Sequence, residues 1–146
     1  MKVKFNNADK KLNYSPKTKL KELVEFIFSN EKKELLFINY IFCSDEFLLK
    51  INQDFLQHDY YTDIITFPLS QKLKPVEAEI YISLDRIKQN AKENNTTSAN
   101  ELVRVVSHGA LHLCGFKDKS KKDIQTMRGK EDFYIKHFNV PRETLK

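Results

Sequence analysis

The segment SANELVRVVSHGALHLCGFKD, residues 98–118, carries the strongest structural and chemical pattern in the chain. Ser98 is suited to cap a helix, and Glu101 three residues later would complete a capping box. Apolar residues then recur at helical spacing as far as Leu113. Gly115 follows, at the position where a glycine commonly ends a helix. The pattern therefore predicts a helix that begins at Ser98 and stops near Gly115.

Two histidines, His108 and His112, lie four residues apart on this predicted helix. Their side chains would leave nearly the same face, one turn apart. Asp118 follows just after the glycine turn. Two imidazoles and a carboxylate make a three-ligand site of the kind used by catalytic zinc, which keeps a fourth position open. We predict that these three residues bind one Zn²⁺ ion per chain.

Two simpler interpretations compete with the metal site. A histidine on an apolar helix is usually a core residue with satisfied hydrogen bonds. Asp118 stands among Lys117, Lys119, Lys121 and Lys122, so it could also be a solvated surface charge.

The length and composition of the whole chain limit the number of domains and the class of protein. A chain of 146 residues predicts one domain, residues 1–146, and 40% hydrophobic with 31% charged residues is typical of a soluble globular protein. The formal net charge of +5 permits an anionic partner such as nucleic acid, although a lysine-rich solvated surface explains it equally well. Cys43 and Cys114 are distant and form no CxxC pair, so we expect buried free thiols. No signal peptide or membrane span is expected, which favours the cytoplasm.

Predicted strands and helices mix along the chain without strict alternation, which indicates an α+β fold with a mixed sheet of about four strands, helices packed on it and the histidine helix central. Pro16 is expected to open the first helix, and Phe47, Leu48, Ile51 and Phe55 to face inward from the second. His58 and His137 are expected to have surface or capping roles. The predicted strands are 2–6, 35–43, 63–67 and 79–83, the later helices are 44–57, 84–93, 98–115 and 120–137, and 70–76 is a predicted loop.

The segment HGALHLCGFKD, residues 108–118, resembles the signature His-Gly-x-Leu-His-Leu-x-Gly-Tyr-Asp-His of the YbeY family. Upstream, residues 62–68 (TDIITFP) are similar to the family's Thr-Asp-Val-Leu-Ser-Phe-Pro, and 78–83 resembles its Gly-Asp-Ile strand. The resemblance implies a zinc-dependent endoribonuclease that cuts single-stranded RNA in small-subunit ribosomal RNA maturation. The implied partners are ribosomal RNA and ribosome-associated proteins, with no membrane and no small-molecule cofactor.

The chain departs from the family pattern at two places. The family's third histidine corresponds to Asp118, which keeps the spacing but replaces a nitrogen donor with an oxygen donor. Leu56 stands where the family commonly has an arginine thought to contact RNA. Arg104, one turn before His108, is a candidate substitute. The candidate RNA-binding residues are Arg104, Lys117 and Lys119, with Lys121 and Lys122 beside them.

Two further functions share parts of this pattern. The spacing also matches the metzincin proteases, HExxHxxGxxH, whose glutamate after the first histidine is the general base. Gly109 occupies that position here and carries no base, which disfavours peptide hydrolysis. A non-catalytic ribosome-associated protein with a structural metal would need a fourth ligand, and the sequence offers none. No general base for RNA cleavage can be assigned from sequence.

Overall fold

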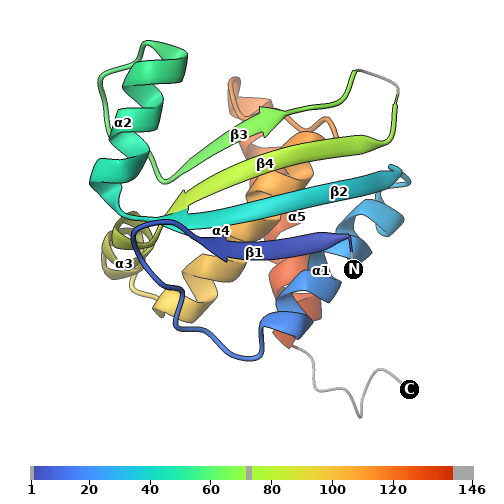
Figure 1. The fold of residues 1–146 in the computed structure, drawn as a ribbon. Helices are drawn as coiled ribbons and strands as arrows, with labels where there is room; N and C mark the ends of the chain where they lie inside the picture. Colours follow the sequence, from blue (N-terminus) through green and yellow to red (C-terminus); the bar gives the residue numbers. More distant parts are fainter. Residues whose placement is uncertain (1, 72–73, 140–146) are drawn as a thin grey trace.

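The computed structural model describes residues 2–71 and 74–139, in the order β-α-β-α-β-β-α-α-α (Figure 1). The strands and helices are β1 (Val3–Asn7), α1 (Lys17–Asn30), β2 (Leu35–Cys43), α2 (Asp45–Leu56), β3 (Ile64–Pro68), β4 (Val76–Ser83), α3 (Leu84–Glu93), α4 (Ser98–Leu113) and α5 (Lys121–Asn139).

The four strands form one mixed sheet in the order β1-β2-β4-β3. β1, β2 and β4 run parallel, and β3 pairs antiparallel with β4 at one edge. Tyr40 of β2 pairs with Ile80 of β4, which in turn pairs with Thr66 of β3. This register places one row of side chains across three strands on a single face of the sheet. The predicted α+β fold with a mixed sheet is confirmed.

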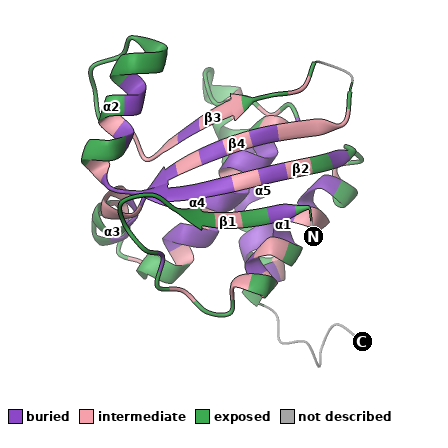
Figure 2. Ribbon diagram, viewed as in Figure 1, coloured by how far each residue is buried: buried purple, intermediate pink, exposed green. Residues whose placement is uncertain are grey.

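Helices α1, α4 and α5 lie together on one face of the sheet (Figure 1). The main core fills the space between them, and buried residues concentrate on the helix surfaces that face the sheet (Figure 2). Ile38, Tyr40 and Phe42 alternate along β2 and all point into this core. The buried Tyr40 hydroxyl donates a hydrogen bond of 3.0 Å to the Val106 carbonyl of α4. α4 is therefore fixed to the centre of the sheet, as predicted for the histidine helix.

A smaller apolar cluster lies on the opposite face, where α2 packs near one end of the sheet. Leu48 and Ile51 of α2 are buried there against Ile65 of β3. The prediction that Phe47 and Phe55 also face inward is wrong, since they are 36% and 72% exposed. α2 contacts the sheet with only one narrow stripe, so the rest of its apolar side chains remain in solvent.

Three predicted boundaries needed correction. The N-cap of α4 is Thr97 rather than Ser98, because the Thr97 hydroxyl accepts the Asn100 N–H at 3.0 Å. Pro16 is the N-cap of α1 and not its first helical residue. β4 begins at Val76 and not at Glu79, because pairing with β2 extends it. Pairing between strands is a tertiary effect that a local pattern does not contain.

Candidate functional site

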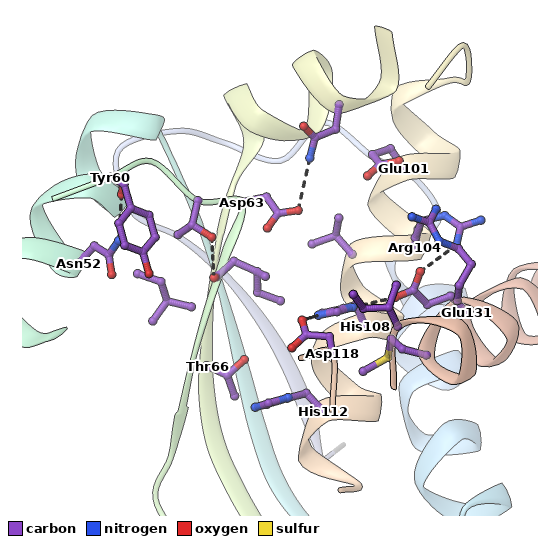
Figure 3. Close-up of a pocket in the computed structure, with 18 of the residues that line it drawn as sticks. Asn52, Tyr60, Asp63, Thr66, Glu101, Arg104, His108, His112, Asp118 and Glu131 are labelled. Carbon is purple, nitrogen blue, oxygen red and sulfur yellow. Dashed lines mark hydrogen bonds and ion pairs between the residues drawn. The ribbon is translucent and has the colours of Figure 1, made fainter. Parts of the chain in front are cut away.

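A pocket of about 750 Å³ opens between α4, α5, β3 and the segment that joins α2 to β3 (Figure 3). His108, His112 and Asp118 all line it, so the structure brings the three predicted metal ligands to one cavity. In Figure 3, Asn52 and Tyr60 lie on one side of the pocket, and Arg104 and Glu131 lie on the other.

Gly109 explains how α4 can present its histidines so close to the sheet. A Cβ atom at this position would lie 3.0 Å from Ile64 Cδ1 and 3.1 Å from Ile80 Cδ1. A glycine thus lets the helix approach β3 and β4 closely. The same geometry directs position 109 into the core rather than the pocket. A general base could not act from there, which agrees with the exclusion of metzincin chemistry.

His108 is held by a buried carboxylate on the neighbouring helix. Its Nδ1–H donates to Glu131 Oε2 at 2.7 Å, and its Nε2 lies 3.3 Å from Asp118 Oδ2. The Glu131 side chain is only 7% exposed and also accepts from Arg104 at 2.8 Å. Histidine ligands of metals typically donate their second ring N–H to such a carboxylate. Glu131 therefore fixes the ring so that Nε2 faces the pocket.

Burial and charge act together on the ionisable groups of the pocket. Burial lowers the pKa of His108, but the hydrogen bond to Glu131 and the surrounding carboxylates outweigh it, so its pKa is raised. Burial raises the pKa of Asp63 and of Glu101, which both line the pocket. Carboxyls in such surroundings are suited to holding or transferring a proton.

The three predicted ligands line the same cavity, but their side chains are not arranged around one common point. Among residues 2–71 and 74–139, no three His, Cys, Asp or Glu side chains are arranged so that they could hold a metal ion. The donor types fit zinc nevertheless, and Glu131 supplies the outer carboxylate that a histidine ligand needs. His112 and Asp118 are both exposed to the pocket, so their side chains are free to turn toward an ion.

The candidate RNA-binding residues occupy different places. Arg104 lines the pocket, but its guanidinium is held by Glu131 and by Asp132, at 2.8 and 2.7 Å. Its observed contacts orient Glu131. Lys117 and Lys119 are exposed and do not line the pocket.

Sequence reasoning did not single out Glu131 or Arg128, two residues of α5 that line the pocket. Glu131 could have been noticed as a charged residue among the buried positions Met127, Tyr134 and Ile135 of the same helix. Asp63 was predicted as the first residue of a strand and as part of a family motif, but not as a site residue. It accepts a hydrogen bond from Asn90 at 3.3 Å.

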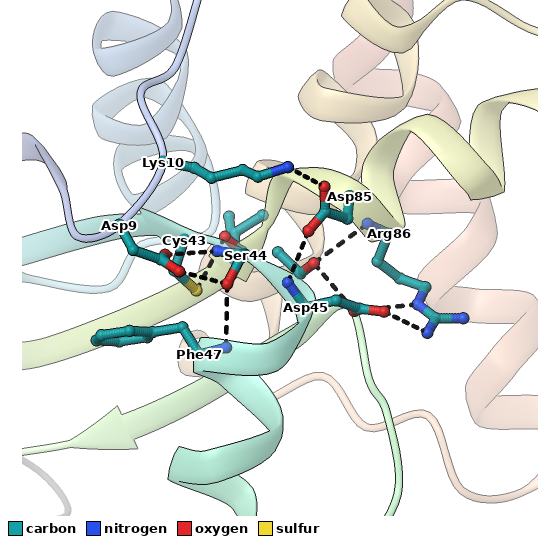
Figure 4. A network of polar contacts seen from close by, with 10 residues as sticks. Asp9, Lys10, Cys43, Ser44, Asp45, Phe47, Asp85 and Arg86 are labelled. Atoms are coloured by element: carbon teal, nitrogen blue, oxygen red, sulfur yellow. Dashed lines mark hydrogen bonds and ion pairs between the residues drawn. The ribbon is translucent and has the colours of Figure 1, made fainter.

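A second polar network lies at the end of the sheet where α2 and α3 begin (Figure 4). Ser44 caps α2 and Ser83 caps α3, each by accepting a backbone N–H at 3.1 Å. Asp45 binds Arg86 at 2.7 Å, and Asp85 accepts from Lys10 and from the Asp45 backbone. This network is structural. It fixes the start of the two helices that lead to the pocket.

The remaining predicted residues lie as expected or nearly so. Cys43 and Cys114 are buried free thiols. His137, in the last turn of α5, stacks on Phe26 with ring centroids 4.1 Å apart. His58 is exposed, but it also lines the pocket, which the surface assignment did not anticipate. A search of the described residues for a helix with the length and hydropathy of a membrane span gave none.

Comparisons with known proteins identify the family. The family model described as Endoribonuclease YbeY matches residues 3–139. The chain belongs to the YbeY family. An Endoribonuclease YbeY of Cytophaga hutchinsonii is 47% identical over 128 residues, covering 88% of this chain and 90% of that protein. Another, from Porphyromonas gingivalis, is 51% identical over 108 residues, covering 74% and 69%.

A solved structure agrees with this assignment. The solution structure of a Thermotoga maritima protein superposes with a TM-score of 0.66 at 29% identity, covering 93% of this chain and 88% of that one. The YbeY relatives are named as endoribonucleases, and the comparisons give no support to a metalloprotease or a non-catalytic binding protein.

Proposed function

We propose that this protein is a zinc-dependent endoribonuclease that cleaves single-stranded segments of ribosomal RNA, during maturation of the small-subunit RNA in the cytoplasm. RNA cleavage is the activity for which the matched family and its relatives are named. The zinc ion, the ribosomal substrate and the cellular site extend beyond those names.

The observation that carries the proposal is the orientation of His108. Glu131 binds Nδ1 at 2.7 Å, so the lone pair of Nε2 is directed into the pocket, toward Asp118. His108 Nε2 and Asp118 Oδ2 lie 3.3 Å apart and both line the pocket, so one ion could contact both atoms. The pair His108–Asp118, with His112 one turn further along α4, supplies two nitrogen donors and one oxygen donor.

The charge of the pocket also supports a bound cation. Its lining includes the carboxylates Asp63, Glu101, Asp118 and Glu131, but only the two guanidiniums of Arg104 and Arg128. An RNA phosphate would be repelled by this excess of carboxylates unless a cation were present. When bound, zinc polarises a phosphoryl oxygen and activates water at neutral pH.

The side chains of the pocket then have distinct roles. Glu131 holds the His108 tautomer and ring plane, and Arg104 orients Glu131 by donating to its other carboxylate oxygen. β3 and the segment before it close the pocket opposite α4, where Thr62 and Thr66 line it. A strand of RNA would enter between this wall and α5.

Metal analysis combined with two cleavage assays tests the proposal. Purified protein is measured for zinc by mass spectrometry and is then given structured ribosomal RNA or casein. We expect about one zinc ion per chain and cleavage of RNA only. Asp118→Ala should lose most of the metal and the cleavage. Asp54→Ala is a matched control, since Asp54 is exposed to a similar extent, 50% against 48%, and lies outside the pocket.

The outcomes separate the possibilities. Casein cleavage would indicate a protease, and neither activity in zinc-loaded protein would favour a binding protein. If Asp118→Ala keeps the zinc content and RNA cleavage of the parent, Asp118 is a surface charge and the proposed ligand set is wrong.

A further inference from the structure

Two aromatic rings line the pocket on the side away from α5. His58 and Tyr60 stack on each other, with ring centroids 5.1 Å apart and planes 20° apart, and both line the cavity. Tyr60 is 55% exposed. An apolar ring face of this size in solvent has a cost, and two stacked rings at the mouth of a pocket form a flat surface that a third ring could extend.

The pair is held in place by the buried residue Asn52. Its side-chain amide donates to the Tyr60 carbonyl at 2.9 Å, and its backbone carbonyl accepts from the His58 N–H at 3.0 Å. The Tyr60 hydroxyl also contacts His58 Nδ1 at 3.0 Å. Asn52 is itself only 2% exposed. The backbone of both residues is thus tied to the end of α2, which reduces the conformational entropy lost when a ligand stacks on the rings.

A cation lies on the other side of the same pocket. Arg128 of α5 lines the cavity and is exposed. Whereas Arg104 is held by two carboxylates, the Arg128 side chain makes no hydrogen bond or ion pair with any residue in 2–71 or 74–139. It remains available for an anionic ligand.

We propose that the pocket binds single-stranded RNA with one unpaired base stacked on the His58–Tyr60 pair and a neighbouring phosphate on Arg128. This inference rests on the proposed function. It adds that the bases of the RNA contact the wall with His58 and Tyr60, and that the phosphates contact the wall with Arg128. Bases offer a π-face that stacks on aromatic side chains regardless of sequence, and guanidinium groups bind phosphate oxygens. A base inside a duplex cannot present its face to the rings, so the arrangement selects unpaired RNA.

The inference also accounts for Leu56, which replaces the arginine common in the family. Leu56 lines the pocket beside the ring pair and is 38% exposed. An apolar side chain there extends the surface on which a base can lie. Leu56 carries no positive charge for the RNA backbone, but Arg128 on the opposite side of the pocket does.

Binding of labelled oligonucleotides tests the inference. The probes are an eight-nucleotide single-stranded RNA, an abasic ribose-phosphate chain of the same length and an RNA duplex. Fluorescence anisotropy is followed at 4 °C, over times in which gels show intact probe. Loss of one base–aromatic stack predicts that Tyr60→Ala weakens binding of the base-containing strand roughly 5- to 150-fold, and leaves binding of the abasic chain unchanged. Tyr60→Phe should retain most of the affinity.

Tyr61→Ala is the matched control. Tyr61 is the same residue type, is adjacent in sequence and is 51% exposed, but it does not line the pocket. We expect an effect below about twofold. Arg128→Gln should weaken binding of both single-stranded probes equally and reduce the dependence of log K on log salt by about one phosphate contact.

Two results would overturn the inference. One is that Tyr60→Ala and Tyr61→Ala behave alike, and the other is that the parent binds the abasic chain or the duplex as tightly as the single strand. RNA cleavage is measured separately on the parent. If the parent cleaves RNA while Tyr60→Ala binds normally, only the stacking site is wrong; if the parent neither binds nor cleaves RNA, the proposed function fails with it.

Discussion

Replacing Glu131 with Gln should weaken zinc binding and also lower the free energy of unfolding. The substitution keeps the size of the side chain but removes its charge, and it leaves a single acceptor oxygen where two are now used. Oε2 accepts from His108 and Oε1 accepts from Arg104. The amide nitrogen of Gln would then face an N–H of one of these partners, so one of the two hydrogen bonds must be lost.

The magnitude follows from these contacts. The Glu131 side chain is 7% exposed, and a hydrogen bond to a charged group at such a site contributes about 1.5–3 kcal/mol to the free energy of unfolding. Arg104 keeps its second partner, Asp132, at 2.7 Å, so it is not left as an unpaired buried charge. Loss of the carboxylate behind a histidine ligand typically lowers metal affinity about 10- to 100-fold.

Competitive titration with a zinc chelator measures the affinity, and urea denaturation of the metal-free protein measures the stability. Asp132→Asn is the control, because Asp132 binds the same arginine but has a 60% exposed side chain and no contact with His108. Its effect should stay below about 1 kcal/mol, with unchanged zinc affinity. Equal zinc affinities for Glu131→Gln and the parent would refute the role assigned to Glu131.

Three further predictions concern other parts of the molecule. Gly109→Ala should lower the free energy of unfolding by up to about 2 kcal/mol in urea denaturation, because crowding against two isoleucines costs about 1–3 kcal/mol and the helix gains about 1 kcal/mol. Hydrogen bonds from Lys10 and from the backbone N–H of residue 45 lower the pKa of Asp85 below its ordinary 3.8. The ionised Asp85 carboxylate therefore stabilises the fold above pH 3.8, and this stabilisation is lost as the pH falls through the lowered pKa. Asp85→Asn should therefore be less stable than the parent at pH 7, and a pH series of denaturation curves should show the difference vanishing in acid. Burial raises the pKa of Cys43 and of Cys114 to about 12, so a colorimetric thiol reagent at pH 8 should modify neither in native protein and both in urea.

The sequence was sufficient for those features that a local pattern contains. The helical spacing of His108 and His112 predicted one face of α4, and the dense apolar run of residues 35–43 predicted the strand β2. Residue 44 was predicted to begin the second helix, and Ser44 is the N-cap of α2, because capping depends on residues only three positions apart.

Features that depend on distant residues could not be predicted. The bond between His108 and Glu131 joins two helices 23 positions apart, and no local pattern pairs them. Phe55 has the spacing of an inward-facing residue, but it meets the sheet only edge-to-face at Phe67 of β3, with ring centroids 6.3 Å apart, and it remains 72% exposed. Thr97 and Ser98 are both good capping residues, and only the backbone angles distinguish the extended N-cap from the first helical residue.

The helix that carries both histidines is also the helix on which the main core is built. Residues of α4 pack against the sheet and against α1, α3 and α5, and most of its side chains are buried. Amide protons in such an element exchange with solvent only when the whole domain unfolds, whereas exposed segments such as residues 57–61 open at a small fraction of that free energy. Backbone amides in α4 should therefore exchange slowly, and those in the segment before β3 should exchange fast. A ligand would meet a wall as rigid as the core on the α4 side, and on the other side a segment that is held at His58 and Tyr60 by hydrogen bonds to Asn52.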